Sequence, residues 1–293
     1  MKTMEFIASR NLTVLELLKE NGLSRKLIKS MKAKGNIKKD GYIIYLQKEL
    51  VPGDKVSITI EEDYSDIEPV MMPIDIVYED DELLVINKQY GLSVMSTMNM
   101  HEITLINGLS YYFQENGILS KVHVINRLDR NTTGLMVVSK NRYSAKKLNY
   151  ALKDSLKRRY YAIVYGILPE KEGTVSLNIG KESDMTVKRI VRSDGKEAIT
   201  TYKVVKEFNN YSLLDIELLT GRTHQIRVTF SHLGFPLVGD DFYQEKEDDN
   251  MLMLHSYYLE FVHPTTGKKN IIDIGLPDRF KDFIIKNGGQ VND

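Results

Sequence analysis

The chain has 293 residues, more than a usual single domain, and this length predicts one small and one large domain. Its 40 basic and 40 acidic residues give no formal net charge, which argues neither for nor against a nucleic-acid partner. Because no cysteine is present, disulfides, iron–sulfur clusters and thiolate zinc sites are excluded. Residues 1–10 lack the long apolar core of a signal peptide, and no later stretch approaches the roughly twenty apolar residues that span a bilayer. We therefore expect a cytoplasmic protein without a membrane partner.

Residues 1–62 are predicted to form a compact α+β unit, with two short helices followed by strands. Apolar side chains recur at helical spacing in two stripes, which are Leu12, Leu15 and Leu18, then Leu27, Ile28 and Met31. Gly22 and Gly35 stand where helices end, and Ser24 is a candidate N-cap of the second helix. The alternating stretch 55–60 is typical of a strand.

Basic residues gather in two runs. Seven lysines and arginines and no acid lie between residues 25 and 39, and eleven lie between residues 121 and 159 against only Asp129 and Asp154. Such faces could meet RNA phosphates, although a basic run can also be no more than a solvated helix face. Taken together, the two runs favour the nucleic-acid interpretation.

The N-terminal unit resembles a divergent S4-type RNA-binding domain. The similarity rests on Ser24-Arg25 and Leu27 in the second helix, on Gly35, and on the closing strand at 53–56, while residues 36–41 match the family pattern more loosely. The resemblance implies that one helix face binds RNA through four side chains, namely Arg25, Lys26, Lys29 and Lys32.

Residues 63–74 are acidic and proline-containing without a clear period, which predicts a linker before a larger domain at 75–293. That domain is predicted to open with a hairpin over 76–88. Further strands are predicted at 135–139, 160–165, 200–205 and 213–219, and helices at 145–152 and 223–232. Strands in succession, without a nucleotide-binding glycine loop, favour an α+β fold with a mixed sheet over a doubly wound one.

The segment 126–135 is a polar, charged loop that runs directly into an apolar strand. One interpretation is a turn held by side-chain hydrogen bonds. The alternative is chemical, because Arg127 and Arg130 flank Asp129, and a carboxylate near a guanidinium stays ionised even when partly desolvated.

This segment resembles the "HRLD..TSGL" signature of the RluA family of pseudouridine synthases. Asn126 stands at the usual His and Thr133 at the usual Ser. The resemblance implies a mainly antiparallel central sheet flanked by helices, with Asp129 as the catalytic carboxylate acting on the ribose side of the scissile bond. It also makes Arg127 a candidate to fill the base stack that the extruded nucleotide leaves.

Two further segments continue the similarity in the order of the family. Residues 157–166 match its "K.Y.A.V.G" pattern, which implies that Tyr160 is the active-site tyrosine, although a strand aromatic more often covers a core. Residues 219–228 match "GRTHQIRVH", with Thr229 in place of the last His. This implies that Arg227 pairs with Asp129 and that Arg222 contributes to RNA binding or loop structure, whereas the residues alone also allow a solvated helix.

The sequence thus predicts an enzyme that isomerises specific uridines in structured RNA to pseudouridine, without a cofactor or metal. Ribosomal RNA is slightly favoured over transfer RNA, because S4-like domains often accompany synthases that act on it, and we expect a monomer without an obligate protein partner. Two alternatives stay open. One is a non-catalytic RNA-binding or ribosome-assembly protein that retains the fold, and the other is a metal-dependent hydrolase using Asp129 and His224.

Overall fold

The computed structural model describes residues 2–61, 66–96, 102–151, 156–244 and 250–291. The start of the predicted linker, up to residue 65, and the end of the helix predicted over 145–152 lie outside these ranges. No helix within the described ranges is long and apolar enough to cross a membrane.

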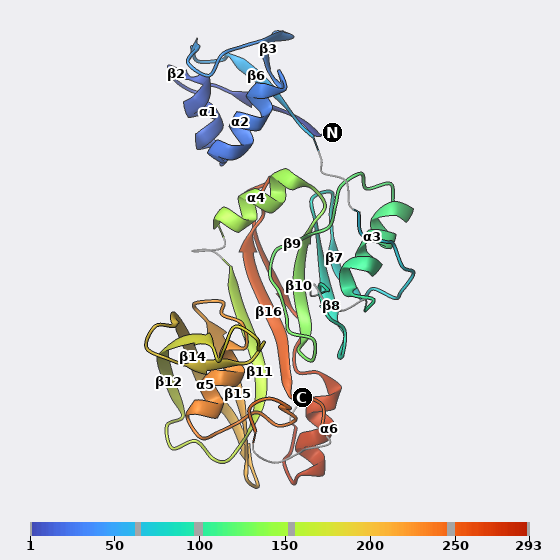
Figure 1. The fold of residues 1–293 in the computed structure, drawn as a ribbon, viewed down its shortest axis with the longest axis vertical. Coiled ribbons are helices and arrows are strands. Elements are labelled where there is room, and N and C mark those ends of the chain that lie inside the picture. The colour runs from blue at the N-terminus through green and yellow to red at the C-terminus, as the bar shows by residue number, and fades with distance from the viewer. Residues whose placement is uncertain (1, 62–65, 97–101, 152–155, 245–249, 292–293) are drawn as a thin grey trace.

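The N-terminal unit, residues 2–60, has a four-stranded antiparallel sheet in the order β1-β6-β3-β4 and two helices (Figure 1). Its elements are β1 (Lys2–Ile7), β2 (Leu12–Thr13), α1 (Val14–Glu20), α2 (Arg25–Ala33), β3 (Ile37–Lys39), β4 (Tyr42–Ile43), β5 (Glu49–Leu50) and β6 (Lys55–Ile60). The prediction that helices come first was wrong, because β1 precedes them. Strand β1 mixes polar and apolar residues without the regular alternation of β6, and all six of its residues pair with β6.

The predicted helix ends of this unit are confirmed. The Ser24 hydroxyl accepts a hydrogen bond from the Leu27 amide at 3.3 Å, which satisfies one of the free donors at the start of α2. Gly22 and Gly35 follow the helices with φ of 80° and 68°. The apolar stripes of α1 and α2 pack on the sheet in a core of their own, to which Tyr143 from α4 also contributes.

The larger part of the chain forms an eleven-stranded mixed sheet, with the path β13-β12-β14-β15-β11-β16-β10-β8-β7 and with β17 and β9 added beside β16 and β10. Its strands are β7 (Ile76–Glu79), β8 (Leu83–Lys88), β9 (His123–Val124), β10 (Thr133–Ser139), β11 (Lys157–Tyr165), β12 (Glu172–Lys181), β13 (Arg189–Val191), β14 (Lys196–Phe208), β15 (Tyr211–Leu218), β16 (Leu254–Val262) and β17 (Lys269–Asp273). All pairs between these strands are antiparallel except β10 with β16. The predicted α+β class with a mainly antiparallel sheet is therefore confirmed.

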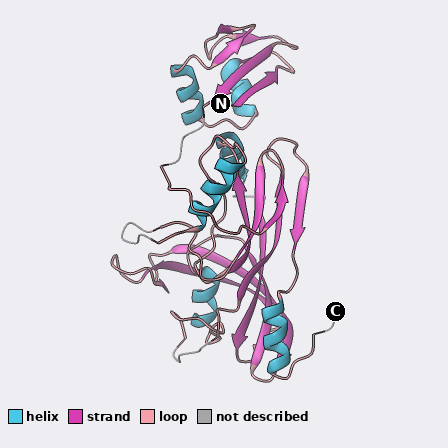
Figure 2. Ribbon diagram, turned by 90° about the vertical axis from the view of Figure 1, so that its right-hand side faces the viewer, coloured by secondary structure: helices cyan, strands magenta, loops and turns pink. Residues whose placement is uncertain are grey.

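Helices cover both faces of this sheet (Figure 2). They are α3 (Leu105–Glu115), α4 (Arg142–Ala151), α5 (Gln225–His232) and α6 (Asp278–Lys286). In β8, Leu84 and Ile86 join the core that contains α3, whereas Leu83 and Val85 join the core that contains α4. Since successive side chains of a strand point to opposite faces, β8 is buried on both, which explains its unbroken apolar run.

The parallel pairing of β10 with β16 depends on Gly134, which lies opposite Ser256 with φ of 108°. A β-carbon at Gly134 would stand 2.1 Å from the carbonyl oxygen of Ser256. The two backbones can approach this closely only because the residue has no side chain. The start of β10 directly follows the loop that carries Asp129, so this approach also sets where the loop ends.

Gly134→Ala is expected to lower the free energy of unfolding by about 3 kcal/mol or more, since backbone strain and overpacking add together. Urea denaturation followed by circular dichroism measures this change. Gly267→Ala is the matched control, because Gly267 has φ of 70° but open space around its α-carbon. It should cost only about 1–2 kcal/mol. Equal losses in the two variants would contradict the close-approach argument.

Candidate active site

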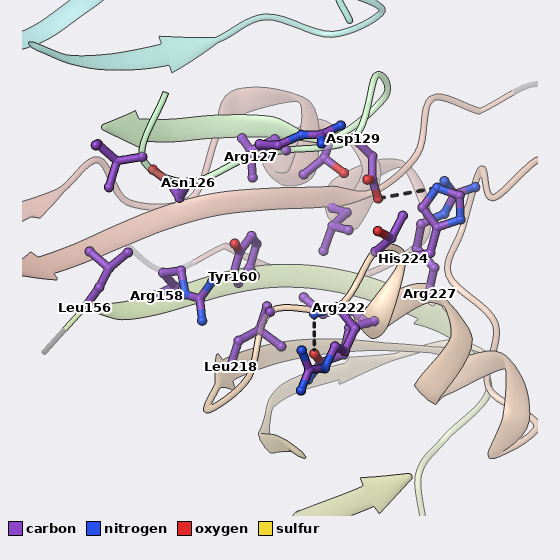
Figure 3. A pocket seen from close by; sticks show the side chains of 18 residues that line it. Asn126, Arg127, Asp129, Leu156, Arg158, Tyr160, Leu218, Arg222, His224 and Arg227 are labelled. Atoms are coloured by element: carbon purple, nitrogen blue, oxygen red, sulfur yellow. Dashed lines mark hydrogen bonds and ion pairs between the residues drawn. The ribbon is translucent and has the colours of Figure 1, made fainter. Parts of the chain in front are cut away.

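A cavity of about 370 Å³ lies between the loop before β10, the start of β11, the end of β15 and the start of α5 (Figure 3). Five of the predicted site residues line it, which are Arg127, Asp129, Tyr160, Arg222 and Arg227. The other four lie on α2 in the N-terminal unit, where all are exposed: Arg25, Lys26, Lys29 and Lys32. The chain thus brings together residues that are up to a hundred positions apart in sequence.

Asp129 sits in a tight turn whose ends are fixed by hydrogen bonds. Its carbonyl accepts from the Thr132 amide at 3.1 Å, and its carboxylate is partly exposed to the cavity. Before it, the buried Asn126 accepts from the Val137 amide at 2.7 Å and donates to the Leu135 carbonyl at 3.3 Å. The asparagine at the usual histidine position therefore anchors the loop to β10.

Lys88, which the sequence analysis missed, ties the other end of this loop to β8. Its buried ammonium donates to the carbonyls of Gln89, Leu92 and Arg130 at 2.9–3.0 Å. Burial lowers the pKa of Lys88 to about 8, an effect that the nearby Asp129 opposes. Three carbonyl acceptors compensate for the desolvation of the charge, so the lysine holds the backbone directly after Asp129. A lysine that closes an apolar strand is the only sequence signal for this role.

A second buried cluster lies behind the start of β10. The Thr133 hydroxyl accepts from Arg279 of α6 at 2.8 Å and bonds Nδ1 of His255 at 2.7 Å. Burial, together with the charge of Arg279, lowers the pKa of His255 to about 3. The histidine is thus neutral in the folded protein, and the Thr133 hydroxyl links α6 to β10, the strand that follows the Asp129 loop.

Arg227, on α5, forms ion pairs other than the expected one with Asp129. Its Nε and Nη2 bond the two carboxylate oxygens of Asp240 at 2.9 and 2.6 Å, and Nη2 also reaches Asp241 at 2.9 Å. Within the described ranges, Arg227 forms ion pairs with these two acids and none with Asp129. Asp240 is suited to be the partner of Arg227 because its carboxylate also accepts hydrogen bonds from the amides of Phe242 and Tyr243 in the turn that follows.

His224 is the residue that faces the Asp129 carboxylate, with Nε2 3.9 Å from Oδ2 (Figure 3). It precedes α5 in the left-handed conformation, with φ of 56°, so the helix begins two residues later than predicted. Burial lowers the pKa of His224. Tyr243 Oη accepts from the Arg189 amide at 2.9 Å and lies 2.7 Å from Nδ1. When Tyr243 donates to Nδ1, the imidazole proton sits on Nε2 and points at Asp129.

Tyr160 forms the apolar wall of the cavity on β11 and is buried among the residues of the main core. Burial raises the pKa of its phenol, while the neighbouring Arg158 opposes this shift. Arg158 itself donates to the Thr220 carbonyl at 3.3 Å. The site thus offers a flat ring beside a guanidinium, which is a surface suited to a planar base.

The cavity is strongly cationic. Its described lining contains four arginines and a single acid, which are Arg127, Arg158, Arg222, Arg227 and Asp129. No cluster of three His, Asp or Glu side chains suited to hold a metal ion is present in the described ranges. The positive charge around the cavity attracts a polyanion.

Comparison with known proteins agrees with this geometry. Residues 82–232 match the family described as RNA pseudouridylate synthase. The chain is 36% identical over 280 residues to the uncharacterized RNA pseudouridine synthase YjbO of Bacillus subtilis, with 93% of this chain and 98% of the relative covered. It is 33% identical over 290 residues to ribosomal large subunit pseudouridine synthase D of Haemophilus influenzae, covering 93% and 89% of the two chains. The structure of human RNA pseudouridylate synthase domain containing 1 is similar, with a TM-score of 0.62 and 26% identity over 79% of this chain and 94% of that one.

Arg227→Met should lower the free energy of unfolding by about 3–5 kcal/mol, because it leaves the fully buried Asp240 carboxylate without its cation. Denaturant titration checks this value. Asp241→Asn serves as the control, since the Asp241 side chain is 54% exposed and a pair at the surface contributes about 0–1 kcal/mol. A small decrease in Arg227→Met would show that the buried pair does not hold α5 in place.

The neutral state of His255 makes stability depend on pH. The pKa of His255 is about 3 in the folded protein and about 6.5 when unfolded. Between these values the unfolded chain binds a proton that the folded protein does not, so the free energy of unfolding is highest above pH 6.5 and falls as the pH drops toward 3. Between pH 6 and 4, His255→Asn should show a slope of unfolding free energy that is shallower by about 1.4 kcal/mol per pH unit. His232→Asn, at an exposed histidine, is the control, and identical slopes in all three proteins would contradict the assignment.

Proposed function

Because the chain belongs to the RNA pseudouridylate synthase family and isomerises uridine to pseudouridine in RNA, we propose that Asp129 is its catalytic carboxylate and ribosomal RNA its preferred substrate. The observation that carries the first assignment is the position of Asp129. It is the one acid among the described residues lining a cationic cavity, opposite the buried ring of Tyr160.

The reaction breaks the bond from C1′ to N1, turns the uracil and rejoins it through C5, so atoms and electrons are conserved. Asp129 acts on the ribose side, either by attacking C1′ or by assisting removal of a 2′ proton. Tyr160 supports the detached uracil with its ring. Arg227, through its pair with Asp240, holds α5 and with it His224 beside Asp129. The reacting atoms are hidden in stacked RNA, so the nucleotide is extruded at a cost of about a few kcal/mol. The exposed Arg127 fills the vacated stack.

The N-terminal unit binds RNA outside the cavity as an S4-type domain. Its helix α2 presents four exposed basic side chains and no acid, which suits the binding of phosphates: Arg25, Lys26, Lys29 and Lys32. The similarity to ribosomal large subunit pseudouridine synthase D, over nearly the whole chain, supports ribosomal RNA as the substrate.

Asp129→Asn is expected to lower the rate of pseudouridine formation by about 10³-fold or more while RNA binding persists, since the amide keeps the shape of the side chain and loses its basicity. The measurement is pseudouridine mapping by carbodiimide labelling on total RNA from a deletion strain that carries wild type or variant. Asp241→Asn, which alters an exposed acid of the same region, should restore the modified sites. If no site depended on the gene, a non-catalytic RNA-binding role would replace the proposal.

The double variant Lys26→Met, Lys29→Met should weaken RNA binding and flatten its salt dependence. Removing one lysine–phosphate ion pair reduces the slope of log affinity against log salt by about 0.7 to 0.9. Fluorescence anisotropy across a salt series measures this slope on the RNA identified by mapping. Lys286→Met, at the end of α6, is the matched control because α6 lies at the opposite end of the molecule (Figure 1). An unchanged slope in the double variant would remove α2 from the RNA-binding face.

A further inference from the structure

A second cavity, of about 410 Å³, lies directly beside the active-site cavity. The two share three lining residues, Gly221, Arg222 and Thr223, in the turn between β15 and α5. The far side of the second cavity is formed by the end of β12, the start of β13 and the turn that leads into β14. The turn 221–223 therefore forms part of the wall of both cavities.

The second cavity is lined by positive charge. Four basic side chains and one acid contribute to its wall, namely Lys181, Arg189, Lys196, Arg222 and Asp194. The single acid is already neutralised, because Arg192 holds both carboxylate oxygens of Asp194. The guanidinium of Arg222 is fixed above β14 by a hydrogen bond from Nε to the Glu197 carbonyl at 2.8 Å.

Arg189 adds a donor that the protein itself does not use. Its Nη1 is buried and has no hydrogen-bond partner among the described residues. Its backbone amide donates to Tyr243 at 2.9 Å, and Tyr243 in turn contacts His224 beside Asp129. A buried guanidinium nitrogen without an acceptor is costly, and the group chemically suited to satisfy it beside a cavity of this charge is an anion.

We infer that this second cavity binds a backbone phosphate of the RNA strand that carries the target uridine, through Arg189, Lys196 and Arg222. This inference rests on the proposed function and adds to it a place where the flanking nucleotide is held. A phosphate seated there fixes the register of the strand, so that the neighbouring base enters the active-site cavity. Binding of the phosphate is used to position the substrate, and no bond to it is made or broken.

The test uses the full-length protein and the RNA identified by pseudouridine mapping. Lys196→Met should raise the half-saturating RNA concentration about tenfold in single-turnover assays, with the maximal rate unchanged, since one charge-assisted hydrogen bond is removed but the reacting groups are untouched. Lys203→Met is the matched control, because Lys203 is exposed on the same strand and lines a different cavity. Both lysines are exposed, so neither substitution threatens folding.

A second arm identifies the ligand as a phosphate. Phosphates that flank the target uridine are replaced one at a time by uncharged methylphosphonates. We expect one position at which neutralisation weakens binding about tenfold for wild type and for Lys203→Met but clearly less for Lys196→Met, in which only Arg189 and Arg222 still face the phosphate. The inference is overturned if the effect of neutralisation on binding is not smaller in Lys196→Met than in wild type at any position. It is also overturned if the two lysine variants behave alike. If wild type forms pseudouridine but the lysine variants do not differ, only the phosphate site fails. If wild type forms no pseudouridine in any RNA, the proposed function fails and the phosphate site fails with it.

Discussion

The active site depends on the buried ion pair between Arg227 and Asp240. Charges placed in a protein interior are costly unless they are paired with good geometry, and here two parallel hydrogen bonds and two backbone amides supply that compensation. The pair fixes the first turns of α5 against the following loop. The pair thereby also positions three groups in or beside the cavity. His224 and Arg222 lie directly before α5, and Tyr243 lies in the loop that follows it.

The opposite wall is held by a separate set of interactions around Asp129. Asn126 and Lys88 bind backbone groups on either side of the loop, and Gly134 lets its exit approach β16. The carboxylate itself keeps only one close polar neighbour among the described residues, the imidazole of His224 at 3.9 Å. A rigid loop with a loosely engaged carboxylate suits a group that must act on substrate, because little has to be broken when the RNA arrives.

The two cavities are alike in that positively charged side chains line both of them. In the first, arginines surround the single acid for which we propose the catalytic role, and in the second, lysines and arginines surround an acid that is already paired. The shared turn at 221–223 couples them, so binding of the strand in one cavity positions the base in the other. Zero net charge is compatible with RNA binding because the positive charge is concentrated where the strand passes.

The sequence by itself determined the α+β class, the four strands β10, β11, β14 and β15, and the family, since these follow from local periodicity and from segments such as 126–135 that keep their chemistry wherever they fold. It also selected Asp129, Tyr160 and Arg227, which the fold gathers in one cavity, although their roles remain proposals. Only the tertiary structure decided which acid Arg227 binds, that Lys88 clamps the loop, and that β1 is a strand. Each of these depends on a partner elsewhere in the chain, and neither a charge nor the irregular polar pattern of β1 carries a local signal of the group that it will pair with.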